Sequence, residues 1–111
     1  MDINDILKGP QRRTKTVRID GLPDLILTEL TASERWHVVD ELPDTNEGNK
    51  QNMFIAEKLL CSLLGYSVKP TKEQIVKFSE QYGHDVIDLL WSSLMDFSAI
   101  DNNAVDNAKK P

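Results

Sequence analysis

The spacing of apolar and polar positions changes near residue 30. Before that point, residues 16–20 (TVRID) alternate apolar and polar side chains, and residues 25–28 (LILT) follow the turn residues Gly21 to Asp24. Alternation with a period of two on both sides of a turn predicts a β-hairpin. Because two strands alone are only marginally stable in water, the hairpin is expected to pack on helices.

After the hairpin, apolar residues recur every three or four positions, which is typical of amphipathic helices. The helices are expected at about residues 31–42, 50–64, 71–82 and 85–97. Thr31 with Glu34 and Thr71 with Gln74 have the spacing of capping boxes, and Gly65 is expected to end the second helix in the C′ position. The predicted fold is therefore mainly α (α+β), with a short N-terminal β-hairpin followed by about four helices in a small bundle.

Two of these helices have distinctive apolar stripes. In the first, Ala32, Trp36 and Val39 recur at helical spacing. The fourth is apolar on several sides, and its two stripes are Val86, Leu90 and Leu94, and Ile87, Trp91 and Met95. A helix of this kind is either central to the core or half of an interface, so the chain is expected to associate with itself as a homo-oligomer.

Composition then divides the chain into one domain with two polar ends. Residues 1–13 are expected to form a flexible basic arm, residues 14–100 a single helical domain with its hairpin, and residues 101–111 a disordered tail. The apolar fraction of 40% and the charged fraction of 28% are ordinary for a globular protein.

The net charge of −5 is unevenly distributed. Residues 1–18 carry five basic and two acidic side chains, whereas residues 20–47 carry eight acidic side chains and one arginine. An acidic centre repels phosphates, so nucleic-acid binding is not expected. No apolar run is long enough to span a membrane, and a single cysteine, Cys61, fits a reducing cytoplasm.

The residues that could carry chemistry are scattered. His37, His84 and Cys61 lack the short spacings of a zinc site. Serines such as Ser62 lie within predicted helices, not on a strand-to-helix turn. We therefore predict neither an enzyme nor a cofactor. The remaining prediction is a partner-binding groove on neighbouring stripes of the second and fourth helices, formed by Leu59, Leu63, Trp91 and Met95.

Four stretches in this order resemble the tail assembly chaperones of long-tailed (siphovirus-type) bacteriophages. They are residues 29–35 (ELTASER), 56–65 (AEKLLCSLLG), 70–74 (PTKEQ) and 86–98, which begin with VIDLL and end with MDFS. The resemblance covers about residues 14–100 and lies in an order of features, not in a catalytic signature.

The resemblance implies an ATP-independent chaperone in the host cell cytoplasm. It would bind the tape measure protein, keep it soluble, recruit the tail tube protein, and be absent from the finished virion. Family members are commonly extended by a programmed frameshift, and Lys109-Lys110 is compatible with a slippery site. Two alternatives remain: a small structural protein of the tail or head–tail connector, and an acidic host-takeover adaptor.

Overall fold

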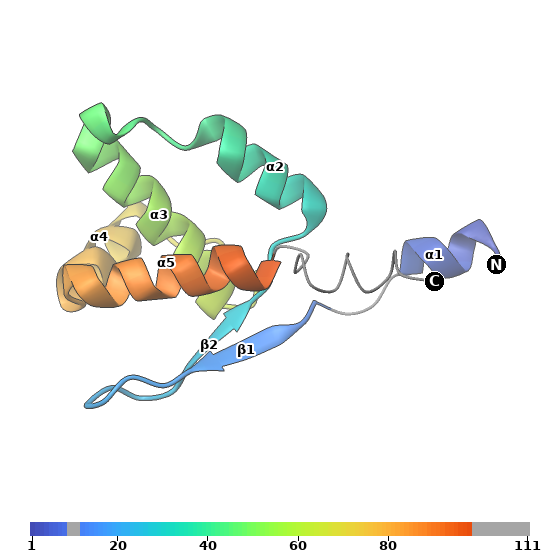
Figure 1. Cartoon of the computed structure of the whole chain (residues 1–111), viewed down its shortest axis with the longest axis horizontal. Coiled ribbons are helices and arrows are strands. Elements are labelled where there is room, and N and C mark those ends of the chain that lie inside the picture. Colours follow the sequence, from blue (N-terminus) through green and yellow to red (C-terminus); the bar gives the residue numbers. More distant parts are fainter. Residues whose placement is uncertain (9–11, 99–111) are drawn as a thin grey trace, which may run out of the picture.

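A computed structural model describes residues 1–8 and 12–98 of the chain (Figure 1). In chain order its elements are the helix α1 (Ile3–Lys8), strands β1 (Thr14–Val17) and β2 (Leu25–Thr28), the helix α2 (Ala32–Glu41), a short 3₁₀ helix η1 (Thr45–Glu47), and the helices α3 (Gly48–Leu63), α4 (Lys72–Gln81) and α5 (His84–Ser98). The mainly helical α+β fold with an N-terminal hairpin is as predicted. The predicted tail, residues 101–111, lies outside the described residues.

The two strands form an antiparallel hairpin in which Thr14 pairs with Thr28 and Val17 with Leu25. The ladder of β1 therefore begins and ends earlier than the predicted strand at residues 16–20. Residues 18–24 form a loop that is wider than predicted, since strand pairing ends at Val17 and Leu25. Within the loop a tight turn forms, in which Gly21 takes a φ of +83° and the Leu22 N–H donates to the carbonyl of Ile19.

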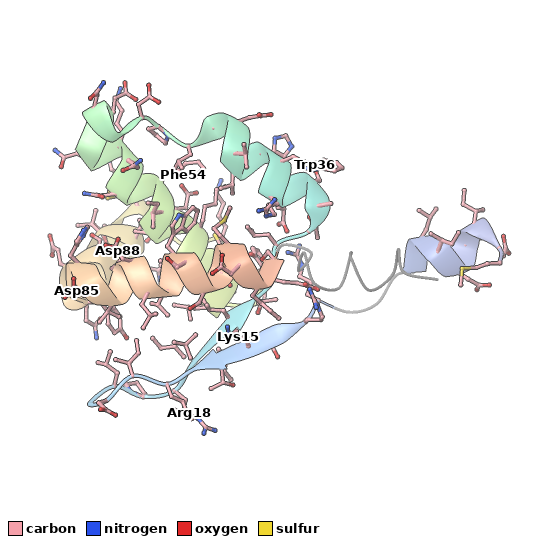
Figure 2. The ribbon with its side chains drawn as sticks, in the orientation of Figure 1. Lys15, Arg18, Trp36, Phe54, Asp85 and Asp88 are labelled. Carbon is pink, nitrogen blue, oxygen red and sulfur yellow. The ribbon has the colours of Figure 1, made fainter. Side chains whose placement is uncertain are left out.

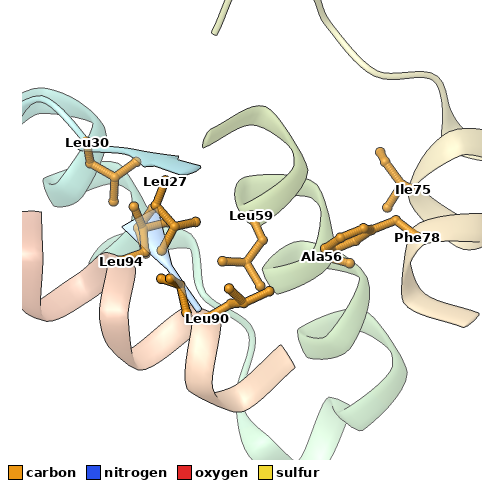
Figure 3. Packing of buried hydrophobic residues seen from close by; sticks show 10 residues of the cluster. Leu27, Leu30, Ala56, Leu59, Ile75, Phe78, Leu90 and Leu94 are labelled. Carbon is orange, nitrogen blue, oxygen red and sulfur yellow. The ribbon is translucent and has the colours of Figure 1, made fainter. Parts of the chain in front are cut away.

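α3 is the central element of the bundle, in contact with β2, α4 and α5. Figure 3 shows Leu59 of α3 facing Leu90 of α5, while Ala56 lies beside Phe78 of α4. Leu59, Leu90 and Leu94 have no exposed surface. Each fully buried leucine contributes about 1.5–3 kcal/mol relative to an exposed one, so this contact between α3 and α5 is a main source of stability.

α2 presents a different side to the bundle than its apolar stripe suggests. Val38 is buried, whereas Trp36 and Val39 are exposed. Glu34 fixes the rotation of the helix, because it closes the capping box with Thr31 and is paired with Arg12. The stripe of Ala32, Trp36 and Val39 consequently faces outward.

The N-terminal segment contains a helix that the sequence analysis does not predict. α1 lies within the segment expected to be a flexible arm, and it begins with the N–H groups of Asp5 and Ile6 bonded to the carbonyl of Asp2. Figure 1 shows α1 beyond the bundle, at the end of the molecule opposite α4. The segment expected to be a flexible arm is therefore partly helical. Its basic residues Arg12 and Arg13 form ion pairs with Glu34 and Glu29 of the same chain.

Candidate functional site

The end of α3 creates the first wall of a surface groove. Gly65 has a φ of +66°, its N–H bonds to the carbonyl of Ser62, and the N–H of Tyr66 bonds to that of Cys61. These two bonds are the Schellman arrangement, which confirms the predicted helix stop at Gly65. The reversal leaves Leu64 and Val68, on either side of it, exposed at 39% and 63%.

α4 supplies the opposite wall. Its capping box is as predicted, because the Gln74 N–H donates to Thr71 Oγ1 at 3.2 Å and the Thr71 N–H donates to Gln74 Oε1 at 2.9 Å. Ile75 and Phe78 point inward and are buried. Since the inward face of α4 is used for packing, its long polar side chains border the groove.

The α3–α4 groove has a volume of about 390 Å³. It is lined by apolar residues with a polar rim: Leu60, Leu63, Leu64, Val68, Phe78, Tyr82, Gln74, Lys77 and Gln81. Lys77 is the one charged side chain among these lining residues. An open, apolar channel between two helix ends suits the apolar face of a helix, with anchors at positions i, i+3, i+4 and i+7.

A second apolar surface, the Trp36 stripe, lies on α2 and consists of Ala32, Trp36 and Val39. Trp36 is 66% exposed and stands at the edge of the molecule in Figure 2. Tryptophan is enriched among residues that dominate protein interfaces. The stripe is therefore a candidate contact surface, separate from the α3–α4 groove.

Ser62 attaches α3, the first wall of the groove, to the hairpin. Its Oγ accepts a hydrogen bond from the Thr28 N–H at 2.8 Å and donates one to the Thr28 carbonyl at 2.7 Å. The Tyr66 hydroxyl donates to the same carbonyl at 3.3 Å. Burial, followed by the Glu34 carboxylate, raises the pKa of this hydroxyl to about 12, so Tyr66 stays a donor.

Two arginines attach the N-terminal segment to the bundle. Arg12 pairs with Glu34 and stacks on the Tyr66 ring at 4.0 Å. Arg13 Nε donates to Glu29 Oε2 at 2.9 Å, and this hydrogen bond is the main cause of the lowered pKa of Glu29. Burial alone would raise the pKa of Glu34, but hydrogen bonds from Arg12 and Thr31 lower it.

The structure does not bring the four predicted partner-binding residues together in one groove. Leu59 has no exposed surface, because the predicted groove between its helix and the last helix is closed by direct packing; this part of the prediction is wrong. Leu63 lines the α3–α4 groove instead. Trp91 and Met95 are half-buried on α5 and pack against the core, so their role as partner contacts stays a prediction.

The candidate chemical residues remain apart. Within residues 1–8 and 12–98, no three His, Cys, Asp or Glu side chains are grouped so as to hold a metal ion. His37 and His84 are exposed and lie near Glu41 and Asp88 on their own helices. Burial, chiefly, raises the pKa of the Cys61 thiol, which keeps it protonated at neutral pH.

Of the residues that line the α3–α4 groove, sequence reasoning had identified only Leu63, and the exposed Leu64 and Val68 are among those it missed. The sequence signal that could have identified them is an apolar residue on each side of a helix-stopping glycine, because loop segments are normally polar.

No helix of the described ranges is long and apolar enough to cross a membrane. Comparisons of the chain with protein-family models, with curated proteins and with solved structures find no match.

Proposed function

We propose that the chain is an ATP-independent tail assembly chaperone of the long-tailed phage type. It holds an amphipathic helix of the tape measure protein in the α3–α4 groove and keeps that long, apolar client soluble. The observation that carries the proposal is the groove itself, with Leu64 and Val68 exposed beside Leu63. Such a surface binds without any reacting group, which suits a holding role.

The charge of the chain supports the same role. A net charge of −5 keeps a protein that displays apolar surface in solution. Glu29 and Glu34 are paired with Arg13 and Arg12, so part of the central acidic charge is neutralised within the fold. This pairing favours a protein client over the acidic-adaptor alternative, which needs its acids displayed.

The test is capture of the tape measure protein by two matched variants. Leu64→Lys places a charge in the groove, and Leu89→Lys makes the same change on α5, where the leucine is 48% exposed. We expect co-expression with Leu89→Lys to keep the tape measure protein soluble. Leu64→Lys should weaken capture by at least about tenfold, since an apolar anchor that the client would cover is replaced by a cation. Equal capture by both variants would refute the groove assignment.

Recruitment of the tail tube protein is the second half of the proposal. It would use an extension added by a frameshift at Lys109-Lys110. Mass spectrometry of the products of the intact gene cluster should show a minor, longer species with the same N-terminal peptide. If only the 111-residue product is found and the codons cannot slip, recruitment does not use this route.

A structural protein of the tail or head–tail connector is a second candidate, favoured by the Trp36 stripe. A permanent neighbour would cover Trp36 in the finished particle. Peptides of this chain should be absent from purified virions if it is a chaperone, and stoichiometric with tail proteins if it is a structural component.

A further inference from the structure

A second concave surface of the bundle has an apolar floor and a basic rim. It lies between the first half of α3, the segment that follows α2 and the start of α4, and its volume is about 490 Å³. We call it the lysine pocket. Its floor consists of Pro43, Met53, Phe54, Pro70 and Ile75. Pro70 and Ile75 are buried, so the packing of α4 on α3 holds this floor in place.

The charged residues that line the lysine pocket are Lys50, Lys69, Lys72 and Glu57. All three lysines are exposed, and Lys69 and Lys72 form no ion pair within the described residues. Lys50 Nζ is 3.7 Å from Glu47 Oε1. Even when Glu47 is counted, three positive charges stand against two negative ones. Because the net charge of the chain is −5, this positive excess does not follow from composition.

The acidic residues nearby do not line the lysine pocket. Asp44 and Glu73 are adjacent in the chain to lining residues, but neither is a lining residue itself. A neighbouring concave surface, formed by α3, α4 and α5, has the opposite character, because Glu80 and Asp88 line it and no lysine does. An anionic group is therefore attracted to the lysine pocket and repelled by its neighbour.

The kinds of polar group in the lysine pocket indicate which anion fits it. A site for a small molecule usually encloses its ligand and orients it with a few fixed polar groups. Here the buried lining residues are apolar, and the cations are ammonium groups on long, exposed side chains. Lysine is a flexible point charge that does not select one geometry, unlike arginine. Such a rim suits carboxylates spaced along a chain, and the floor suits an apolar side chain between them.

We propose that the lysine pocket binds an acidic segment of a partner protein. The segment places an apolar side chain on the floor beside Phe54 and its carboxylates near Lys69, Lys72 and Lys50. The lysine pocket shares no lining residue with the α3–α4 groove, so the inference does not rest on the proposed function. It gives the chain a second contact, which recognises a partner by charge as well as by apolar surface.

Fluorescence anisotropy with a synthetic peptide tests the lysine pocket. The probe is the labelled hexapeptide Asp-Asp-Leu-Leu-Asp-Asp, titrated with the full chain up to about 1 mM, because a contact of this size is expected to have a sub-millimolar Kd. Lys69→Gln/Lys72→Gln should weaken binding by at least about fivefold, since two charge interactions are lost. The matched control Lys15→Gln/Arg18→Gln removes two charges from the hairpin and should bind like the unchanged chain. Circular dichroism checks that both variants fold.

Changes to the probe test the rim and the floor separately without altering the protein. Replacing every Asp of the peptide by Asn, or every Leu by Gly, should weaken binding by at least about fivefold. Raising the salt concentration from about 50 to about 500 mM should weaken binding of the original peptide, because salt screens exposed charges.

Several results would overturn the proposal. They are the absence of binding at about 1 mM, and equal losses from the pocket and hairpin variants. Equally strong competition by inorganic phosphate would make the lysine pocket a site for small anions. Sedimentation without the peptide examines a further occupant. A dimer that Lys69→Gln/Lys72→Gln dissociates would show that a second copy, and not a separate partner, fills the lysine pocket.

Discussion

Ser62 is a single hydroxyl that satisfies two backbone groups of Thr28 in a buried position. Replacing Ser62 by Ala should lower the free energy of unfolding by about 1–3 kcal/mol, because the N–H and carbonyl of Thr28 lose their partner. Urea denaturation measures the change. Ser92→Ala on the exposed side of α5 is the control and should stay within about 0.5 kcal/mol of the unchanged chain.

The carboxylate of Glu29 makes stability depend on pH. Its pKa is lowered from 4.5, first by the hydrogen bond from Arg13. Its stabilising contribution is therefore complete above pH 4.5 and is lost as the pH falls through the lowered value. Glu29→Gln should be less stable than the unchanged chain at pH 7, and the difference should shrink below pH 4.5.

Arg13→Gln is the control for this carboxylate, since it removes the same pair from the other side. The double variant should lose less than the two single variants together, as measured by urea denaturation at pH 7. Strictly additive losses would show that Glu29 and Arg13 do not stabilise the fold through each other.

At the residue scale, the sequence predicts helix-capping residues better than it predicts contacts between residues that are distant in the chain. Thr31 and Thr71 act within one turn of helix, so their roles follow from local spacing alone. In the sequence, Ser62 looks like any serine in an apolar helix. Its role depends on a tertiary contact, the packing of β2 against α3, which places the backbone of Thr28 beside it. The clamp from Arg12 to Glu34 is hidden for the same reason, because it joins residues that are distant in the chain.

At the scale of elements, the two glycines at the ends of α3 differ in backbone conformation, so replacing them by alanine should have opposite effects on stability. Gly65 has a φ of +66°, and an added Cβ would meet only Thr28 Oγ1 at 3.8 Å, so conformation and not space opposes a side chain. Gly65→Ala should cost about 1–2 kcal/mol. Gly48 has the helical φ of −45° with open space around it, so Gly48→Ala should stabilise by about 0.4–1 kcal/mol.

Thermal unfolding of both glycine variants checks the pair. Changes of the same sign would contradict this account of how α3 begins and ends. The boundaries of α2, α3, α4 and α5 were predictable to within about two residues, and the starts of α2 and α4 and the end of α3 carry local signals, namely two capping boxes and a Schellman glycine. The rotation of α2 about its axis was not predictable from the sequence. It is set by the contacts of Glu34 with Thr31 and Arg12, and not by the Trp36 stripe.

At the scale of the whole molecule, α1 and the bundle are expected to be energetically independent in a dilute monomer. The apolar side chains of α1 are exposed and contribute little to the core. Removing residues 1–8 should leave the free energy of unfolding at low micromolar concentration within about 0.5 kcal/mol. Arg12→Ala should lower it, because Arg12 contacts both Glu34 and Tyr66. A large loss on truncation would show that α1 packs on its own bundle.

The candidate groove could be predicted only in part. The apolar pattern identifies Leu63 as a helix-face residue, but it does not say which neighbour covers that face. α5 packs directly over Leu59, whereas α4 leaves an open channel at Leu64 and Val68. Which helix covers each side of α3 depends on the paths of the connecting segments. The spacing of apolar residues along a helix does not contain this information.

The two bonds from Ser62 also change what the hairpin can do with other strands. Residues alternate along an antiparallel ladder, so the N–H and carbonyl of Thr28 point away from β1, toward the edge where a further strand would add. Ser62 occupies both groups, so any incoming strand that crosses Thr28 forfeits two ladder bonds. The hairpin therefore resists templated growth along β2, and a protein that displays apolar surface gains a barrier against forming fibres with its own copies.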